Sequence, residues 1–370
     1  MFEEFIRDVV TDMESDEKRD IDLSKLIFNV WLSDKLKDKD FNEQELLKII
    51  KELGTQDFSG QDKITEYLYM FGYKLREDNR LANIGFKNRI EQHYGLEFYY
   101  LELIETLSRE IGTLYYKIID KKETVNKIDE MILFQHIRCC SMFSEVIYLL
   151  KGGFGDAALA RFRSLHESAV ISEFIYRNGE EAAKSYFDYL IVMDLKDLIF
   201  EERELGEKIV DQDYKIDVMK RLDEIKEKRG ESFVDVKRGD YEWARDFLEK
   251  RVNPSFNKIR NSINREHGKK PYKIASNSIH SAPKSMISSI STLDGRVNSG
   301  ASNIGLSLPA TWSTYEMLQM NALVFQMITQ DDKLSLYTQL QGLLILKMLH
   351  ELASNIYENF PEREDDLLDE

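Results

Sequence analysis

Cysteine and proline are both scarce in this chain of 370 residues. The two cysteines, Cys139 and Cys140, are adjacent, and neighbours on a helix point about 100° apart, which disfavours a disulfide between them. We therefore expect buried free thiols and a cytoplasmic protein. Only 5 prolines, together with abundant Leu, Ile, Glu and Lys, favour long uninterrupted helices. The sequence predicts an all-α fold, a multi-helix bundle.

A long uninterrupted apolar run is also lacking. The most apolar window, residues 131–150, contains Arg138 and Glu145 as well as Gln135 and His136, side chains that are costly in lipid. We expect this window to form a buried helix and no membrane span. Residues 1–15 are acidic and have neither the basic start nor the apolar stretch of a signal peptide.

Several motifs that identify enzyme classes do not occur. There is no H-E-x-x-H, no paired C-x-x-C and no dense cluster of acids and histidines, so we expect no metal. The G-x-S-x-G elbow of hydrolases is absent. Glycine-rich phosphate loops are absent too, since "GGFGDA" (152–157) lies between predicted helices and does not follow a strand. We expect no cofactor.

Positive charge is in deficit, with a net charge of −16, so the surface as a whole repels phosphate backbones. The basic segment, residues 258–273, is the exception because it contains six Lys or Arg against one acid, Glu266. It predicts a local patch for RNA or another anion, made of Lys258, Arg260, Arg265, Lys269, Lys270 and Lys273.

Composition divides the chain into three regions. These are an acidic N-terminal helical region (1–125), a helical core (126–360) and an acidic, frayed tail (361–370). The N-terminal helices carry no catalytic motif; they either pack in the ordinary way or bind a protein partner. Residues 200–252 are highly charged and predict a solvated helical excursion.

Two apolar helices and a Ser-rich segment organise the predicted core. A helix over 127–150 ends at Gly152 and Gly153, and Asp156 is the expected cap of the next helix, so the two predict an antiparallel hairpin. Residues 276–311 contain ten serines. Apart from a short helix near its start, we expect this segment to be a long loop that acts as a lid or a binding loop.

A charged pair interrupts the second of these helices. Arg163 and Glu167 lie four residues apart on a face that is otherwise apolar, with Ala160, Val170 and Phe174. Burial of such a pair carries a large desolvation cost. Either the pair is a strut that ties the helix to its neighbours, or Glu167 holds Arg163 to grip a phosphate or carboxylate.

Two other pairs have the spacing of a known motif. Arg161 and His166 are separated by four residues, and Arg260 and His267 by six, within "RNSINREH". Both resemble the R-x4-6-H signature of HEPN ribonucleases, which cleave RNA without metal at a dimer interface. On a regular helix, however, Arg161 and His166 point about 140° apart.

A wider resemblance covers residues 127–350. The segment "GGFGDAALARFRSLHES" with the later "YKIASNSIHSAP" resembles a widespread bacterial helical family of unknown function. The matching positions are Gly153, Arg163, Ser164, Leu165, Glu167, Tyr272, Ser276 or Ser278, and His280. The resemblance implies an all-helical fold and a site near Arg163, Glu167 and His280, without an established reaction.

Three hypotheses for function follow. In the first, the chain is a HEPN-like, metal-independent ribonuclease of a toxin or phage-defence system and forms a homodimer. Arg163 holds the scissile phosphate, Glu167 orients Arg163, and His280 transfers protons. The second hypothesis is a non-catalytic sensor in which Arg163 and His280 hold an anionic ligand and the acidic N-terminal helices contact a protein partner. In the third, Arg163 and Glu167 only brace the core.

Overall fold

The computed structural model describes residues 64–205, 211–249, 253–279, 283, 291–293, 296–298, 300–330 and 335–369. The chain divides into two compact units, Met1–Phe86 and Lys87–Glu370. In the first unit, the described residues belong to helix α4 (Ile64–Ile119). The account below concerns the second unit. The sequence-based division at residues 125 and 360 stays a prediction.

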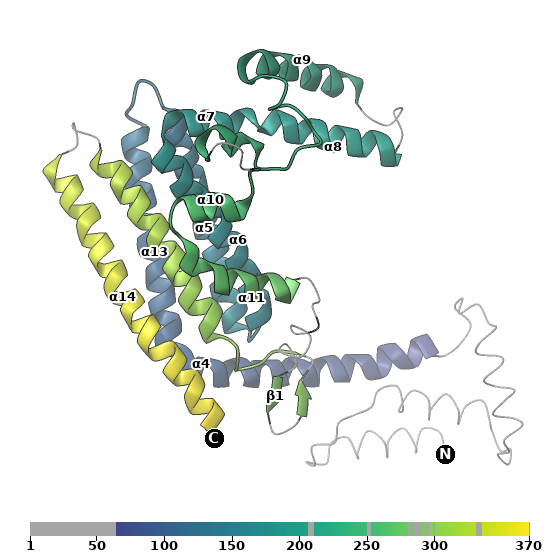
Figure 1. Cartoon of the computed structure of the whole chain (residues 1–370). Helices are drawn as coiled ribbons and strands as arrows, with labels where there is room; N and C mark the ends of the chain where they lie inside the picture. Colours follow the sequence, from purple (N-terminus) through teal and green to yellow (C-terminus); the bar gives the residue numbers. More distant parts are fainter. Residues whose placement is uncertain are drawn as a thin grey trace, which may run out of the picture. The chain divides into compact units, whose positions relative to one another are not determined.

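The described chain is almost entirely helical (Figure 1), which confirms the predicted all-α fold. After α4 come α5 (Lys127–Lys151), α6 (Gly155–Asn178), α7 (Glu180–Asp188), α8 (Leu190–Leu205), α9 (Gln212–Arg229), the 3-10 helix η1 (Glu242–Phe247), α10 (Phe256–Ser262), the 3-10 helix η2 (Glu266–Gly268), α11 (Lys269–Ile279), α13 (Ser307–Thr329) and α14 (Leu336–Asp369). None of the helices in the described ranges is long and apolar enough to cross a bilayer.

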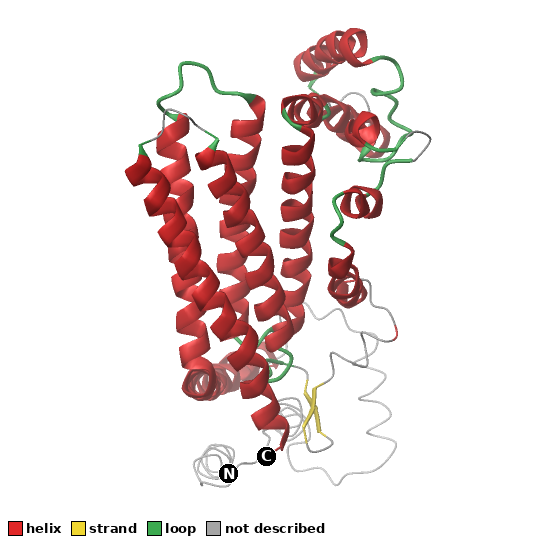
Figure 2. Ribbon diagram, turned by 60° about the vertical axis from the view of Figure 1, so that its left-hand side comes forward, coloured by secondary structure: helices red, strands yellow, loops and turns green. Residues whose placement is uncertain are grey.

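The predicted Ser-rich loop contains regular structure at both ends and in its middle. Its first four residues complete helix α11, and its last residues begin α13. Between them, strands β1 (Ser291–Leu293) and β2 (Arg296–Asn298) form a small antiparallel hairpin (Figure 2) in which Ser291 is opposite Asn298.

Helices α5 and α6 form the predicted central hairpin and pack against each other. Helix α5 ends at Lys151 with Gly152 as its C-cap, and Gly153 has a φ of 77°, a conformation that glycine adopts readily. The predicted cap at Asp156 is wrong. The N-cap residue is Phe154, so Asp156 lies inside the first turn of α6, where its carboxylate complements the helix dipole.

Helix α13 is the centre of the core because it packs against α5, α6 and α14. At one end of α14, Phe360 stacks on Tyr94 of α4, with ring centroids 4.9 Å apart. Both cysteines are buried free thiols, as predicted. Burial raises the pKa of the Cys140 thiol to about 12.

A polar chain crosses this core between α5, α13 and α4. His136 Nε2 lies 3.0 Å from Asn321 Oδ1, and the Asn321 amide donates to Ser108 Oγ at 2.7 Å. Burial lowers the pKa of His136, although the bond to Asn321 opposes this. The chain therefore satisfies a neutral imidazole in the interior.

The acidic tail is helical through Asp369, so the predicted fraying is wrong. Glu364 accepts hydrogen bonds from the Leu306 amide at 2.7 Å and from the Ser307 hydroxyl. The carboxylate thus satisfies amides at the start of α13, which is where a negative charge is favourable.

Candidate functional site

The predicted pair of Arg163 and Glu167 forms on α6, with Nε and Oε1 3.2 Å apart. A third partner comes from α11, because the Tyr272 hydroxyl donates to Glu167 Oε1 at 2.6 Å. The Arg163 guanidinium carbon also lies 5.1 Å from the centroid of the Tyr272 ring. The two charged side chains are 24% and 28% exposed, so the pair is accessible from solvent.

The neighbouring groups keep these side chains in defined protonation states. Burial lowers the pKa of Arg163, but Tyr272 and Glu167 outweigh this effect, and the net shift is upward. Burial and the Glu167 carboxylate raise the pKa of Tyr272. The same two causes raise the pKa of Tyr241 to about 12. At neutral pH the site therefore presents a guanidinium and two phenolic hydroxyls that can donate hydrogen bonds.

Arg260 of α10 faces the same tyrosine. Its guanidinium carbon lies 5.6 Å from the centroid of the Tyr272 ring and 5.8 Å from that of Phe256. The residue is 1% exposed. Its Nη2 donates to Asn257 Oδ1 at 2.9 Å, whereas Nε and Nη1 have no hydrogen-bond partner. Desolvation lowers the pKa of Arg260. A buried cation with two unsatisfied donors is rare in proteins.

We call these residues the Tyr272 cluster: Arg163, Glu167, Tyr241, Arg260 and Tyr272. Its members come from α6, the residue before η1, α10 and α11. The bond from Glu167 to Tyr272 joins residues that are 105 apart in the sequence. The cluster is thus assembled by the packing of α10 and α11 on α6.

A fully buried ionic network borders this cluster. His166 Nδ1 lies 2.7 Å from Glu316 Oε1, and Arg265 donates to Glu316 Oε2 at 2.7 Å. Burial alone would raise the pKa of Glu316, but His166 and Arg265 hold it below its usual value. We call His166, Glu316 and Arg265 the Glu316 network. The carboxylate of α13 thereby ties α6 to the segment between α10 and α11.

The second nitrogen of His166 has no hydrogen-bond partner, and the imidazole packs near Tyr272. His166 Nε2 is buried and makes no hydrogen bond. The centroid of the imidazole lies 5.6 Å from the ring centroid of Tyr272 and 5.7 Å from that of Phe256. Gly268 packs directly on the ring, since a Cβ there would lie 2.5 Å from His166 Cε1. The turn at Gly268 therefore covers the imidazole.

Neither predicted Arg–His pair is brought together. Arg161 donates to Glu145 of α5 at 2.9 Å, whereas His166 points into the core. Likewise, His267 Nε2 lies 2.7 Å from the Tyr315 hydroxyl, whereas Arg260 packs on the rings of Phe256 and Tyr272. Instead, His166 of the first pair and Arg260 of the second pack against one tyrosine.

The basic segment forms a surface patch only in part. Lys258, Lys269, Lys270 and Lys273 are exposed. Arg260 and Arg265, in contrast, are buried, so the prediction that they lie on a surface patch is wrong. A guanidinium can stack on aromatic rings and pair with a carboxylate in the interior, whereas the lysine ammonium is strongly hydrated.

The described residues do not include His280, so its role in proton transfer stays a prediction. Two serines of the resemblance are in helix α11, where Ser276 donates to the Tyr272 carbonyl and Ser278 to that of Ile274. Sequence reasoning missed Tyr241, Asn257 and Glu316. Tyr241 sits beside a short helix and Glu316 contacts residues distant in sequence, so no local pattern marks them. Asn257, in contrast, lies three residues before Arg260 on α10, a helical spacing that could have indicated it.

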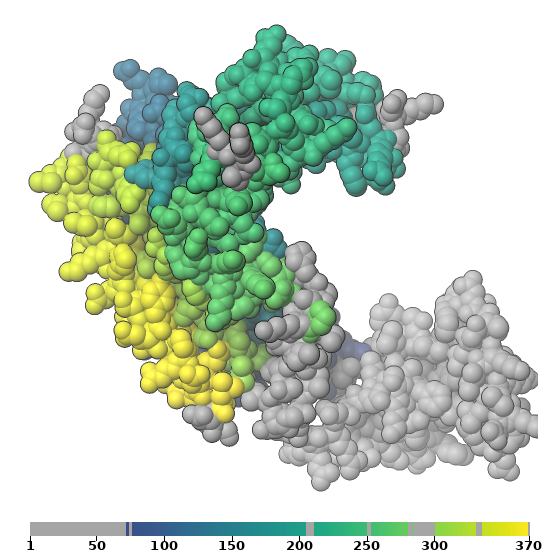
Figure 3. Space-filling model, in the orientation of Figure 1, coloured from purple at the N-terminus to yellow at the C-terminus, as the bar shows by residue number. Residues whose placement is uncertain are grey.

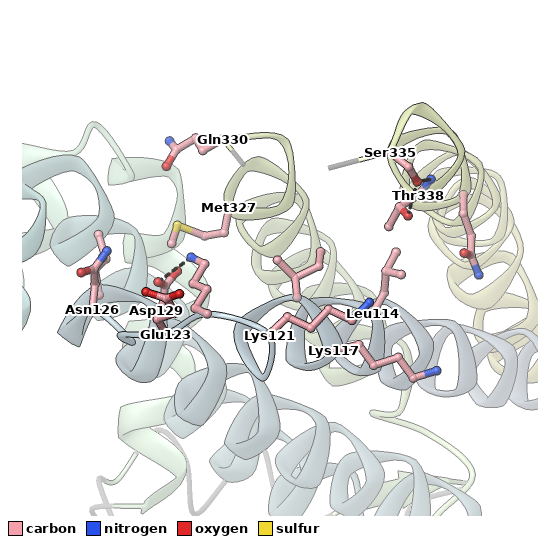
Figure 4. A pocket seen from close by; sticks show the side chains of 14 residues that line it. Leu114, Lys117, Lys121, Glu123, Asn126, Asp129, Met327, Gln330, Ser335 and Thr338 are labelled. Atoms are coloured by element: carbon pink, nitrogen blue, oxygen red, sulfur yellow. Dashed lines mark hydrogen bonds and ion pairs between the residues drawn. The ribbon is translucent and has the colours of Figure 1, made fainter. Parts of the chain in front are cut away.

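A separate pocket of about 1160 Å³ lies at the ends of α4 and α13 and at the starts of α5 and α14 (Figure 4). Lys122 pairs there with Asp129 at 2.7 Å. None of the predicted site residues is among its described lining residues. No group of three or more His, Cys, Asp or Glu suited to a metal occurs in the part of the chain that the structure describes.

In comparisons with known proteins, the part of the chain that carries this site matches one protein family. No curated protein and no solved structure gives a significant match to the chain. Residues 129–297 match the model of a family of unknown function (DUF5677). The matched range contains all five members of the Tyr272 cluster. Over these residues the chain is thus similar to a family of unknown function, which confirms the resemblance that the sequence suggested.

Proposed function

We propose that the Tyr272 cluster binds an anionic ligand that carries a phosphate or carboxylate group. The observation that carries this proposal is the buried guanidinium of Arg260, whose Nε and Nη1 have no hydrogen-bond partner. Leaving donors of a buried cation unsatisfied costs free energy. An anion that accepts from these donors removes that cost, so Arg260 favours the bound state.

The neighbours of Arg260 suit this role. Its guanidinium packs beside the rings of Phe256 and Tyr272, and this packing restricts the side chain and reduces the entropy lost on binding. Arg163 supplies a second cation at the same tyrosine ring. Glu167 orients Arg163 and Tyr272 through direct bonds, so the donors are positioned before the ligand arrives.

Long-range charge supports the same ligand class. The protein has a net charge of −16 and would repel an anion at most of its surface. The four exposed lysines of the basic segment belong to α10 and α11, the helices that also carry Arg260 and Tyr272. They provide a local positive field that attracts anions to this part of the molecule.

Binding is tested by titration calorimetry and thermal shift with inorganic phosphate, a mononucleotide and citrate. We expect at least one of these probes to bind and to raise the melting temperature. Arg260→Met keeps the unbranched apolar part of the side chain but removes the donors, so binding should be lost while the fold is retained.

Arg177→Met is the matched control because Arg177 is a half-exposed arginine of α6 that pairs with Glu173. It should bind as the unchanged protein does. The proposal is wrong if none of the probes binds, or if Arg260→Met binds them as tightly as the control.

A second candidate function is metal-independent cleavage of RNA at the same site. The observation that favours it is the pairing of His166 Nδ1 with Glu316, which leaves Nε2 unpartnered beside Tyr272. A carboxylate that orients an imidazole in this way is typical of general acid–base catalysis. Arg260 and Arg163 would hold the phosphodiester.

In this reaction a histidine takes the proton of the RNA 2′-hydroxyl, whose oxygen attacks phosphorus. The bond from phosphorus to the 5′-oxygen breaks, and that oxygen receives a proton. Cleavage by His166 requires the turn at Gly268 to move, since Gly268 lies against the ring. His280 is the residue that the sequence predicts for the same step.

The experiment is incubation of purified protein with RNA in EDTA. We expect cleavage that is lost in Arg260→Met and in either His166→Gln or His280→Ala. Absence of cleavage, or full cleavage by both histidine variants, rules out this mechanism. A toxin or phage-defence role predicts in addition that expression arrests growth and that Arg260→Met relieves the arrest.

A further inference from the structure

One face of helix α14 exposes a continuous stripe of large apolar side chains. We call it the α14 stripe: Leu336, Tyr337, Leu340, Leu343, Leu344 and Met348, which are between 44% and 78% exposed. Their spacing of three and four residues places them on one side of the helix. The opposite side, with Ile345 and Leu349, is buried. Helix α14, yellow in Figure 3, lies at the surface of its unit.

The stripe is large for a surface that contacts only water. If each half-exposed side chain contributes roughly 100 Å², the stripe presents about 600 Å² of apolar surface. This is the upper end of the size range of the largest apolar patch on a typical monomeric protein. A standard protein interface buries about 800 Å² on each partner. The stripe together with a polar rim reaches that size, so its area suits a stable protein contact.

We propose that the α14 stripe is the contact surface between two copies of this chain, with the two α14 helices antiparallel. The argument is the symmetry of the stripe about position 342. Leu340 and Leu344 lie two residues on either side of it, and Leu336 and Met348 lie six residues on either side. A two-fold axis at this position pairs each residue with its mirror position on the other copy.

The resulting contacts are complementary in chemistry. Leu340 packs on the partner's Leu344, and Leu336 on the partner's Met348, so apolar groups meet apolar groups. Five residues on either side of position 342, Tyr337 meets the partner's Lys347, whose ammonium can lie over the aromatic ring. Within the stripe, only Tyr337 and Leu343 meet side chains that are not apolar, the partner's Lys347 and the partner's Gln341.

The helix is held rigidly behind this surface. At Gly342, on the side that faces the interior, a Cβ would lie 3.0 Å from Phe325 and 3.8 Å from Leu114. Helix α14 therefore packs closely on α13 and α4 at the centre of the stripe, which lowers the entropic cost of association. Beside it lies a groove whose lining includes the polar residues Thr106, Glu110 and Gln341, side chains of the kind found at the rim of an interface.

The oligomeric state tests this proposal. We expect sedimentation velocity of the full chain at micromolar concentration to show a dimer, and Leu340→Glu/Leu344→Glu to show a monomer with an unchanged circular dichroism spectrum. Ile216→Glu is the control, because Ile216 is a 66% exposed apolar residue on α9, and it should remain dimeric. A monomer for the unchanged chain, or a dimer for the double variant, overturns the proposal.

Cysteine cross-linking tests the antiparallel register, with little background because both native thiols are buried. Leu336→Cys/Met348→Cys should form a covalent dimer under mild oxidation. Leu336→Cys alone should not, since twelve residues of helix separate the two copies of position 336 by about 18 Å. Cross-linking of the single variant, or none for the double variant, contradicts this register. The outcome is independent of ligand binding at the Tyr272 cluster.

Discussion

Removing the Glu316 carboxylate is the perturbation for which the structure predicts the largest effect. Glu316 and Arg265 are 1% and 4% exposed as side chains, and Nη2 lies 2.7 Å from Oε2. Glu316→Ala leaves the guanidinium of Arg265 in the interior without this partner and deprives His166 Nδ1 of its acceptor. Both groups then remain desolvated without compensation.

Breaking a buried ion pair on one side costs about 3–5 kcal/mol of unfolding free energy. Arg265 keeps a second carboxylate, Glu173, at 3.6 Å, which reduces the loss. The orphaned His166 nitrogen adds about 1 kcal/mol. We therefore expect Glu316→Ala to lower the unfolding free energy by about 4 kcal/mol.

The assay is urea unfolding at pH 7, followed by circular dichroism, in a double-mutant cycle. In Glu316→Ala/Arg265→Ala both charges are gone, so the loss should be smaller than the sum of the single losses by about 1–3 kcal/mol. Glu181→Ala, in the exposed pair with Lys184, is the control and should change stability far less. A loss below about 1 kcal/mol for Glu316→Ala, or single losses that add within about 0.5 kcal/mol, refutes the reasoning.

The same network predicts a pH dependence. The pKa of Glu316 is lowered in the folded protein. The ionised carboxylate therefore contributes fully to the unfolding free energy above the ordinary glutamate pKa of about 4.3. This contribution is lost as the pH falls through the lower pKa of the folded state. The stability difference between the unchanged chain and Glu316→Ala should therefore shrink below about pH 4.

Two further predictions concern the buried histidines. Gly268→Ala should lower the unfolding free energy by about 1–3 kcal/mol because the added Cβ would lie 2.5 Å from the His166 ring. Gly239→Ala is the control in the same urea titration, since a Cβ added there has no atom within 4 Å. Equal losses of unfolding free energy for the two variants would contradict the packing argument. Because the folded pKa of His136 is lowered, stability should fall as the pH drops below about 6.5, the ordinary histidine pKa. Below this pH the urea midpoint of His136→Gln should change less with pH than that of the unchanged chain. If the midpoints of both proteins changed equally with pH, the result would count against a buried neutral imidazole.

The pairing of Arg163 with Glu167 was predictable because an i,i+4 contact depends only on helix geometry. The resemblance in sequence likewise indicated Tyr272. In contrast, the ionic partners of Glu316 are 150 and 51 residues away in the chain, and periodicity tells which face of a helix is buried but not what covers it. Asp156 illustrates a local failure, since the tight turn at Gly153 lets α6 begin two residues earlier than the capping pattern predicts.

The sequence by itself determined the helical class, the hairpin of α5 and α6 and the burial of both thiols, because proline content, apolar periodicity and glycine stops act over a few residues. Only the tertiary structure decided that Arg260 and Arg265 leave the basic surface for the interior. It also decided that His166 and Arg260, from two separate motifs, meet at Tyr272. The physical reason is that a buried charge is stable only beside partners from other helices, and packing selects those partners.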